Sequence, residues 1–191
     1  MRYPKPKIDK SAIQYYENGF DKGETGEWAI EYALKKALPD NIYILRNLYI
    51  PYRSIVTEID LILLHETGIY VFESKNYSGW IFGNEKHQYW TQSLKGGRKF
   101  KFYNPIFQNR THINAVINQL ELPQEQRPKS YIVFSEQCEL KAIPESSENT
   151  VICKQHDLIG IIEKRIEATP PIYSQAVLSY MNSYLHQFEK Y

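Results

Sequence analysis

Two apolar runs joined by four residues restrict the fold of this chain more than any other feature. Residues 55–64 and 69–75 are rich in β-branched and aromatic side chains, which is typical of β-strands. The link between them, His65-Glu66-Thr67-Gly68, has the length of a hairpin loop and carries glycine where a positive φ is useful. We therefore predict two neighbouring antiparallel strands inside a sheet.

Charged residues interrupt both predicted strands. Asp60 breaks the first run, and Glu73 and Lys75 end the second. Side chains alternate along a strand, so Glu73 and Lys75 share a face. If the loop turns at its middle, residues whose numbers add up to about 133 lie opposite one another. That register pairs Asp60 with Glu73 and Glu58 with Lys75, whereas a shift of one residue would move Asp60 to the other face.

Two opposed carboxylates repel each other, and burying either one alone is costly. A divalent cation removes both objections, and a small cluster of oxygen ligands with room for water suits Mg²⁺ (or Mn²⁺). Lys75 would then orient the attacking water and stabilise charge in the transition state. The simpler interpretation is a salt bridge between Lys75 and Glu58 or Glu73, because the Glu-x-Lys tripeptide is common. The residues leave both interpretations open.

The remaining segments predict a mixed α/β sandwich with a sheet at its centre. Helices are expected at residues 23–38, 105–120, 157–166 and 173–188, and further strands at residues 43–50, 79–82, 88–94, 99–103, 131–134 and 151–153. Pro51 is expected to close its strand. The last helix carries a stripe that we predict to face the core, namely Tyr173, Val177, Tyr180, Met181, Tyr184, Leu185 and Phe188.

A helix acid and a basic hairpin are further candidates. Glu27 shares the stripe of Ile30 and Leu34, so it is either a solvated acid in the first turn of its helix or a group that approaches the metal. Basic residues and aromatics alternate in residues 95–103, so that the hairpin either has an ordinary wet side or contacts phosphates. The candidate phosphate contacts are Lys95, Arg98, Lys99 and Lys101.

Composition excludes several classes of protein. Two cysteines form no disulfide framework or metal-ligand spacing, and no pair of the five histidines has the His-x-x-x-His spacing of a zinc site. The first ten residues lack the apolar core of a signal peptide, and no run reaches the roughly 18 apolar residues that span a bilayer. We expect a cytoplasmic protein with no membrane partner. The net charge of +1 does not decide between partners.

Four segments together resemble one family, the nuclease-related domain (NERD), which occurs chiefly in bacteria and is placed in the PD-(D/E)XK nuclease superfamily. They are residues 23–27 (GETGE), 58–63 (EIDLIL), 68–76 (GIYVFESKN, followed by Gly79) and 104–109 (NPIFQN). Their order along about half of the chain is far more specific than any one of them. Ile59 departs from the pattern, because the superfamily name has proline at that position.

The resemblance implies a restriction-endonuclease-like mixed β-sheet flanked by helices, and a Mg²⁺-dependent nuclease acting on DNA. Asp60, Glu73, the Ser74 carbonyl and Glu27 would bind the metal, Lys75 would assist the nucleophile, and Gln108 would position water or phosphate. We expect a basic arm at residues 1–20, the nuclease-like core at 21–125, and strands and helices at 126–191 that complete the same domain. The alternatives are a module that binds nucleic acid or a protein without cutting, and a homodimer formed through the tyrosine-rich last helix.

Overall fold

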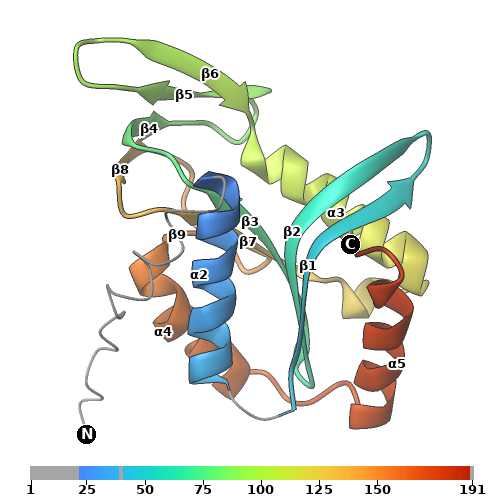
Figure 1. The fold of residues 1–191 in the computed structure, drawn as a ribbon. Helices are drawn as coiled ribbons and strands as arrows, with labels where there is room; N and C mark the ends of the chain where they lie inside the picture. Colours follow the sequence, from blue (N-terminus) through green and yellow to red (C-terminus); the bar gives the residue numbers. More distant parts are fainter. Residues whose placement is uncertain (1–21, 39–40, 190–191) are drawn as a thin grey trace, which may run out of the picture.

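The computed structural model describes residues 22–38 and 41–189, so the predicted basic arm lies outside the described residues. A five-stranded sheet, in the order β1-β2-β3-β7-β9, stands beside a four-stranded sheet in the order β6-β5-β4-β8 (Figure 1). The helices are α2 (Lys22–Ala37), α3 (Pro105–Leu120), the short η1 (Gln124–Gln126), α4 (Gln155–Glu167) and α5 (Gln175–His186). The strands are β1 (Tyr43–Tyr52), β2 (Ile55–His65), β3 (Gly68–Lys75), β4 (Gly79–Phe82), β5 (Tyr89–Ser93), β6 (Lys99–Tyr103), β7 (Lys129–Phe134), β8 (Cys138–Ala142) and β9 (Thr150–Lys154).

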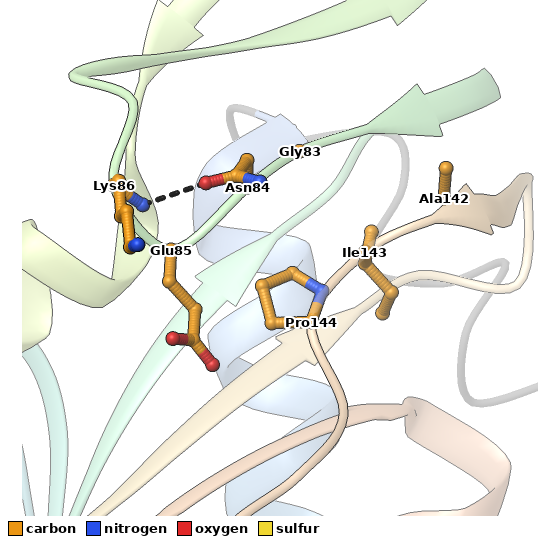
Figure 2. A pocket seen from close by; sticks show the side chains of 7 residues that line it. All are labelled: Gly83, Asn84, Glu85, Lys86, Ala142, Ile143 and Pro144. Carbon is orange, nitrogen blue, oxygen red and sulfur yellow. Dashed lines mark hydrogen bonds between the residues drawn. The ribbon is translucent and has the colours of Figure 1, made fainter.

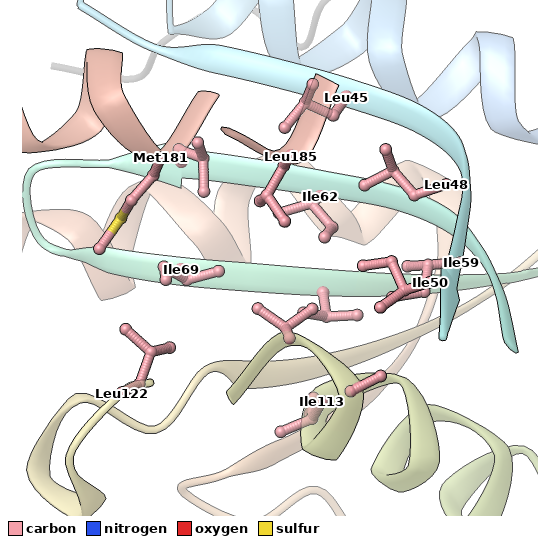
Figure 3. Close-up of a cluster of buried hydrophobic side chains, with 14 of the residues drawn as sticks. Leu45, Leu48, Ile50, Ile59, Ile62, Ile69, Ile113, Leu122, Met181 and Leu185 are labelled. Atoms are coloured by element: carbon pink, nitrogen blue, oxygen red, sulfur yellow. The ribbon is translucent and has the colours of Figure 1, made fainter. Parts of the chain in front are cut away.

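The mixed α/β prediction is confirmed, with helices on both faces of the larger sheet (Figure 1). Helices α2 and α4 cover one face, where Leu34 and Leu158 pack against Phe72 and Tyr131. Helices α3 and α5 cover the other face, where Ile113 and Leu185 join the buried side chains of β1, β2 and β3 (Figure 3). No described helix is long and apolar enough to cross a membrane.

The strands β4, β5 and β6 form, with β8, a second sheet beside the larger one, a division that the expected strands do not reveal. The expected strands do not include β8, which pairs in parallel with β4. The inner face of this sheet packs on the larger one, since Trp90 lies parallel to Phe134 with ring centroids 6.3 Å apart. Local alternation predicts a strand but not its partner, so the division into two sheets was not readable from it.

Two further predictions were wrong. Pro51 does not close β1 but lies within it, opposite Val56, which the edge position of β1 permits because no neighbour needs the missing N–H. On α5, the buried positions are Leu178, Met181 and Leu185, whereas Tyr180 is 68% exposed. Val177, the second misassigned member of the predicted stripe, is 40% exposed.

Candidate active site

Strands β2 and β3 carry the charged residues, and their predicted antiparallel register is confirmed where they pair. The ladder runs from His65↔Gly68 to Leu61↔Phe72, and every pair adds up to 133. It ends one position before Asp60 and Glu73. β1 and β2 continue together to Tyr52↔Ile55, so this hairpin projects beyond the end of β3 (Figure 1).

Asp60 lies at the point where β2 parts from β3. On its other side, the regular β1 ladder skips Asn47, which has the left-handed φ of 52°. Strict alternation breaks here, because Ile59 and Ile62 belong to the same core although they are three residues apart. The Asp60 carboxylate uses the gap: its Oδ2 accepts a hydrogen bond of 2.7 Å from the Ser74 backbone N–H. The aspartate therefore reaches β3 between Glu73 and Lys75.

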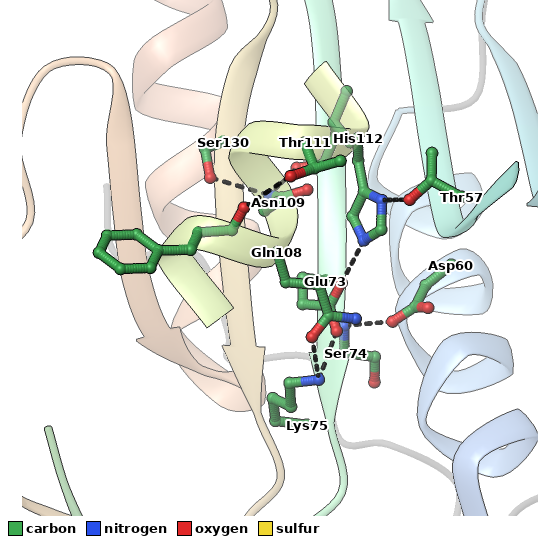
Figure 4. A network of polar contacts seen from close by, with 12 residues as sticks. Thr57, Asp60, Glu73, Ser74, Lys75, Gln108, Asn109, Thr111, His112 and Ser130 are labelled. Atoms are coloured by element: carbon green, nitrogen blue, oxygen red, sulfur yellow. Dashed lines mark hydrogen bonds and ion pairs between the residues drawn. The ribbon is translucent and has the colours of Figure 1, made fainter. Parts of the chain in front are cut away.

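The predicted pairing of Glu58 with Lys75 is wrong. Glu58 lies opposite Tyr49 on β1 and accepts a 2.6 Å hydrogen bond from its hydroxyl. Lys75 instead donates to Glu73 Oε1 and to Gln108 Oε1, the latter at 3.1 Å (Figure 4). The strands have separated before they reach Glu58, so the counting rule no longer applies.

The backbone of Ser74 presents a further oxygen to this place. In a β-strand the N–H and C=O of one residue point to the same edge, because facing residues exchange both bonds. The Ser74 N–H faces Asp60, and so its carbonyl lies on the Asp60 edge as well. Its side chain points toward α2, where a Cβ added to Gly26 would lie 2.7 Å from Ser74 Oγ. Glycine thus allows the helix of Glu27 to approach β3 closely.

Glu73 is almost completely buried, at 1% exposure, yet both of its oxygens have partners. Oε1 accepts from Lys75, and Oε2 accepts from His112 Nε2 at 2.9 Å. Burial acts to raise the pKa of Glu73, but the charge of Lys75 and the hydrogen bond from His112 outweigh it and hold the pKa below its ordinary value. Glu73 is therefore held as a carboxylate.

The pKa of Asp60 is shifted in the opposite direction, upward. Burial raises its pKa well above the ordinary value, and the charges of Glu73 and Glu27 raise it further. The Ser74 N–H and the charge of Lys75 offset only part of this. Asp60 thus sits among like charges without enough compensation, which is the electrostatic situation that a bound cation relieves.

Lys75 remains positively charged. Burial lowers its pKa, but the charge of Glu73 and the hydrogen bond to it raise the pKa above the ordinary value of lysine. Gln108 Oε1 accepts a further hydrogen bond from the ammonium group. A permanently protonated lysine donates hydrogen bonds and supplies charge, and it cannot act as a general base.

Helix α3 brings Gln108 and His112 to the end of β3. Asn104 caps the helix by accepting from Ile106 N–H at 2.9 Å, and Pro105 occupies its first turn. Gln108 and His112 are four residues apart and so share one face. Asn109, also buried, donates to the Val71 carbonyl at 3.0 Å and fixes the helix on β3.

His112 is the residue that reasoning from the sequence missed. It is 3% exposed, and its two ring nitrogens contact Glu73 Oε2 and, at 2.8 Å, Thr57 Oγ1. A carboxylate only accepts, so Nε2 carries the proton that it donates to Glu73. The sequence feature that could have pointed to His112 is its position four residues after Gln108, on the helix face that packs against the sheet.

The predicted phosphate contacts lie apart from this cluster. Lys95, Arg98, Lys99 and Lys101 are exposed on β6 and on the turn before it. The predicted alternation holds in part: Phe102 packs inward, but Phe100 is 50% exposed. A surface hollow of about 350 Å³, lined by Gly83, Asn84, Glu85, Lys86, Ala142, Ile143 and Pro144, contains none of the candidate residues (Figure 2).

The oxygen atoms at the end of β3 fit a magnesium ion. Among the described residues no group of three or more histidine, cysteine, aspartate or glutamate side chains could hold a metal. Mg²⁺ needs less, because it commonly binds through one or two carboxylates and keeps several waters. Asp60, Glu73 and the Ser74 carbonyl supply that number, and each carboxylate oxygen has a second lone pair.

Comparison with known proteins agrees with this reading of the chain. The model of a family described as the nuclease-related domain matches residues 22–135, more than half of the chain. An uncharacterized protein of Bacillus anthracis is 38% identical over 144 residues, which are 74% of this chain and 66% of that protein. The match thus spans just under two thirds of that relative. No solved structure matches.

Proposed function

The chain belongs to the nuclease-related domain family, and on that premise we propose that it hydrolyses phosphodiester bonds of DNA in a magnesium-dependent reaction. The observation that carries the proposal is the meeting of Asp60, Glu73 and Lys75 around the backbone of Ser74. These three residues come from two strands that have already separated. The family's acid and Glu-x-Lys positions are therefore close in space as well as correctly spaced in sequence.

The side chains divide the work of such a reaction between them. Asp60 and Glu73, with the Ser74 carbonyl, would hold the cation. Lys75, cationic and 12% exposed, would donate hydrogen bonds to the attacking water or to a phosphate oxygen and stabilise the charge that builds there. Gln108, bonded to Lys75, would fix the direction of the ammonium group.

Magnesium bound by these oxygens would supply Lewis acidity at the phosphate and lower the pKa of a water molecule. Glu27, whose charge reaches Asp60, would lie at the margin of the cation site. We also propose that the larger sheet has the restriction-endonuclease-like arrangement, and that residues 126–191 complete the same domain as residues 21–125. Strands β7 and β9 support a single domain, since they extend the same sheet beyond β3.

Incubation of the purified protein with plasmid, linear and single-stranded DNA tests the proposal, with Mg²⁺, with Mn²⁺ and with chelator. Lys75→Ala is run in parallel, and Lys164→Ala is the matched control because Lys164 lies exposed on α4, away from the cluster. We expect cleavage that needs the metal, is retained by Lys164→Ala and falls at least 100-fold in Lys75→Ala, since charge stabilisation of this kind is worth about 10²–10³ in rate.

Equal cleavage by wild type and Lys75→Ala would indicate a contaminant and remove the support for this mechanism. Binding of DNA with no cleavage under any metal would instead favour the alternative, a module on a nuclease-like fold that holds nucleic acid without cutting it.

A further inference from the structure

The four-stranded sheet has one packed face and one open face. Ile81, Trp90 and Phe102 point inward and pack with Phe134 of the larger sheet. Residues that alternate with these point the other way. The strand register therefore gives the residues of the open face, in rows of residues that lie opposite one another on neighbouring strands.

Aromatic side chains stand on this open face. Trp80 lies opposite Ser93, and Ser93 lies opposite Lys99, which forms one row across β4, β5 and β6. Tyr89 lies opposite Tyr103 in another row, with ring centroids 6.2 Å apart. Trp80, Tyr89 and Tyr103 are 50%, 51% and 43% exposed. Large aromatic surfaces that remain this accessible commonly mark a binding face.

The two aromatic rows are separated by a row that carries a lysine. Tyr89 and Ser93 are four residues apart on β5, which is about 14 Å at 3.4 Å per residue. Phe82, Thr91 and Lys101 occupy the row between them. The face thus carries a lysine in each of its first two rows, Lys99 in the row of Trp80 and Lys101 in the next, and two tyrosine rings in the third.

Positive charge dominates this face. Lys99 and Lys101 are exposed on β6, and Lys141 of β8 lies over the Trp80 ring, 5.2 Å from its centroid. The acid Glu139 is paired with Lys141. Phosphate is the chemistry that complements such a surface.

One edge of the open face contacts helix α3. The ring of Tyr103 contacts Phe107, with centroids 6.4 Å apart, and Arg110 lies over the Phe107 ring at 4.7 Å. Phe107 precedes Gln108, which contacts Lys75. A ligand on the open face would therefore lie beside the first turns of α3, the helix that carries Gln108.

We propose that the open face of the four-stranded sheet, with Trp80, Tyr89, Tyr103, Lys99 and Lys101, binds single-stranded nucleic acid. Unpaired bases stack on the rings, and phosphates meet the lysines. A duplex hides the faces of its bases and would use the lysines alone. This inference rests on the proposed function, because it names the form of the substrate that the nuclease site receives.

Binding measured without cleavage tests the proposed role of the open face independently of catalysis. Fluorescence anisotropy in the presence of chelator compares the affinity for a labelled oligothymidylate of about 20 nucleotides with that for a duplex of the same length. Stacking is worth about 1–3 kcal/mol per base, so Trp80→Ala and Tyr89→Ala should each weaken binding of the single strand roughly 5- to 150-fold. Trp80→Phe, which keeps a ring, should restore most of it.

Tyr180→Ala is the matched control, because Tyr180 is 68% exposed on α5, in a different layer. Circular dichroism of every variant confirms folding before binding is measured. Unchanged binding in folded Trp80→Ala and Tyr89→Ala, or a duplex bound as tightly as the single strand, would overturn the proposal. No binding of either oligonucleotide would overturn it too, and would leave the face to a protein partner.

The two proposals fail in different ways. Binding of the single strand that depends on the aromatic rings, without any metal-dependent cleavage, would refute the proposed nuclease activity and support the proposed binding by the open face. Cleavage that depends on Lys75 but is indifferent to Trp80 and Tyr89 would refute the proposed binding by the open face and leave the nuclease activity in place.

Discussion

Replacing His112 with leucine is expected to destabilise the protein strongly, because the histidine is a hydrogen-bond partner of two buried groups. Thr57 is 8% exposed and Glu73 is 1% exposed, and they bond to the two ring nitrogens at 2.8 and 2.9 Å. Leucine fills much of the space but offers neither group a partner. The substitution therefore also removes one of the two hydrogen-bond partners of the Glu73 carboxylate.

The magnitude follows from the two groups left behind. Each buried polar group without a partner costs about 1–3 kcal/mol, and a charged one lies at the upper end. His112→Leu should therefore lower the free energy of unfolding by about 3–6 kcal/mol. In a chain of this size 1 kcal/mol corresponds to about 2–4 °C, so the midpoint should fall by roughly 6–24 °C. Urea and thermal denaturation followed by circular dichroism measure both quantities.

A double-mutant cycle separates the network from simple packing. Thr57→Val removes the hydroxyl that His112→Leu leaves without a partner, so the double variant should be more stable than the sum of the single effects predicts, by about 0.5–3 kcal/mol. His87→Leu is the control, because His87 is exposed, and should change stability by no more than about 0.5 kcal/mol. Additive effects of Thr57→Val and His112→Leu, or a loss in His112→Leu no larger than that of His87→Leu, would refute the reasoning.

Two other predictions concern charge and backbone. The Asp60 pKa is raised on folding, so its contribution to stability is present below the unfolded pKa of about 3.9 and is lost as pH rises through the folded pKa. Asp60→Asn should therefore raise the thermal midpoint at pH 7 in chelator, with a gain that shrinks toward pH 4, whereas Asp157→Asn, on the exposed start of α4, should not; a gain independent of pH would contradict this. Gly79→Ala should destabilise in urea denaturation, because Gly79 has a φ of 78° and a Cβ there would lie 2.4 Å from the Ser93 carbonyl oxygen. Gly160→Ala, in the interior of α4 with nothing within 4 Å of its Cβ, should instead stabilise by about 0.5–1 kcal/mol, and equal signs for the two glycines would sink the argument.

The central strands were predictable because their burial leaves a direct mark on the sequence. Strands covered on both faces need nearly continuous apolar residues, and β2, β3 and β7 have them. The hairpin loop then fixed the register down to Leu61↔Phe72. Asp60 and Glu73 stood out because they are charged where that pattern demands apolar residues.

The features that escaped prediction depend on contacts between distant segments. Nothing local to residues 47–60 shows that β2 leaves β3 at Asp60, or that Asn47 takes a left-handed conformation opposite it. Tyrosines were assigned to the core of α5 by their spacing, but Tyr180 keeps its ring in solvent, since tyrosine suits both environments. His112 belongs to no motif and gains its meaning only from Thr57 and Glu73, which lie 55 and 39 residues away.

The position of a bound metal tests the central claim most directly. Crystals of the protein grown with Mn²⁺ would locate the ion by its anomalous scattering. We expect a peak in direct contact with the carboxylates of Asp60 and Glu73 and with the Ser74 carbonyl oxygen, and no such peak in crystals of Asp60→Asn. An ordered Mn²⁺ bound elsewhere, with Asp60 and Glu73 carrying none, would contradict the account.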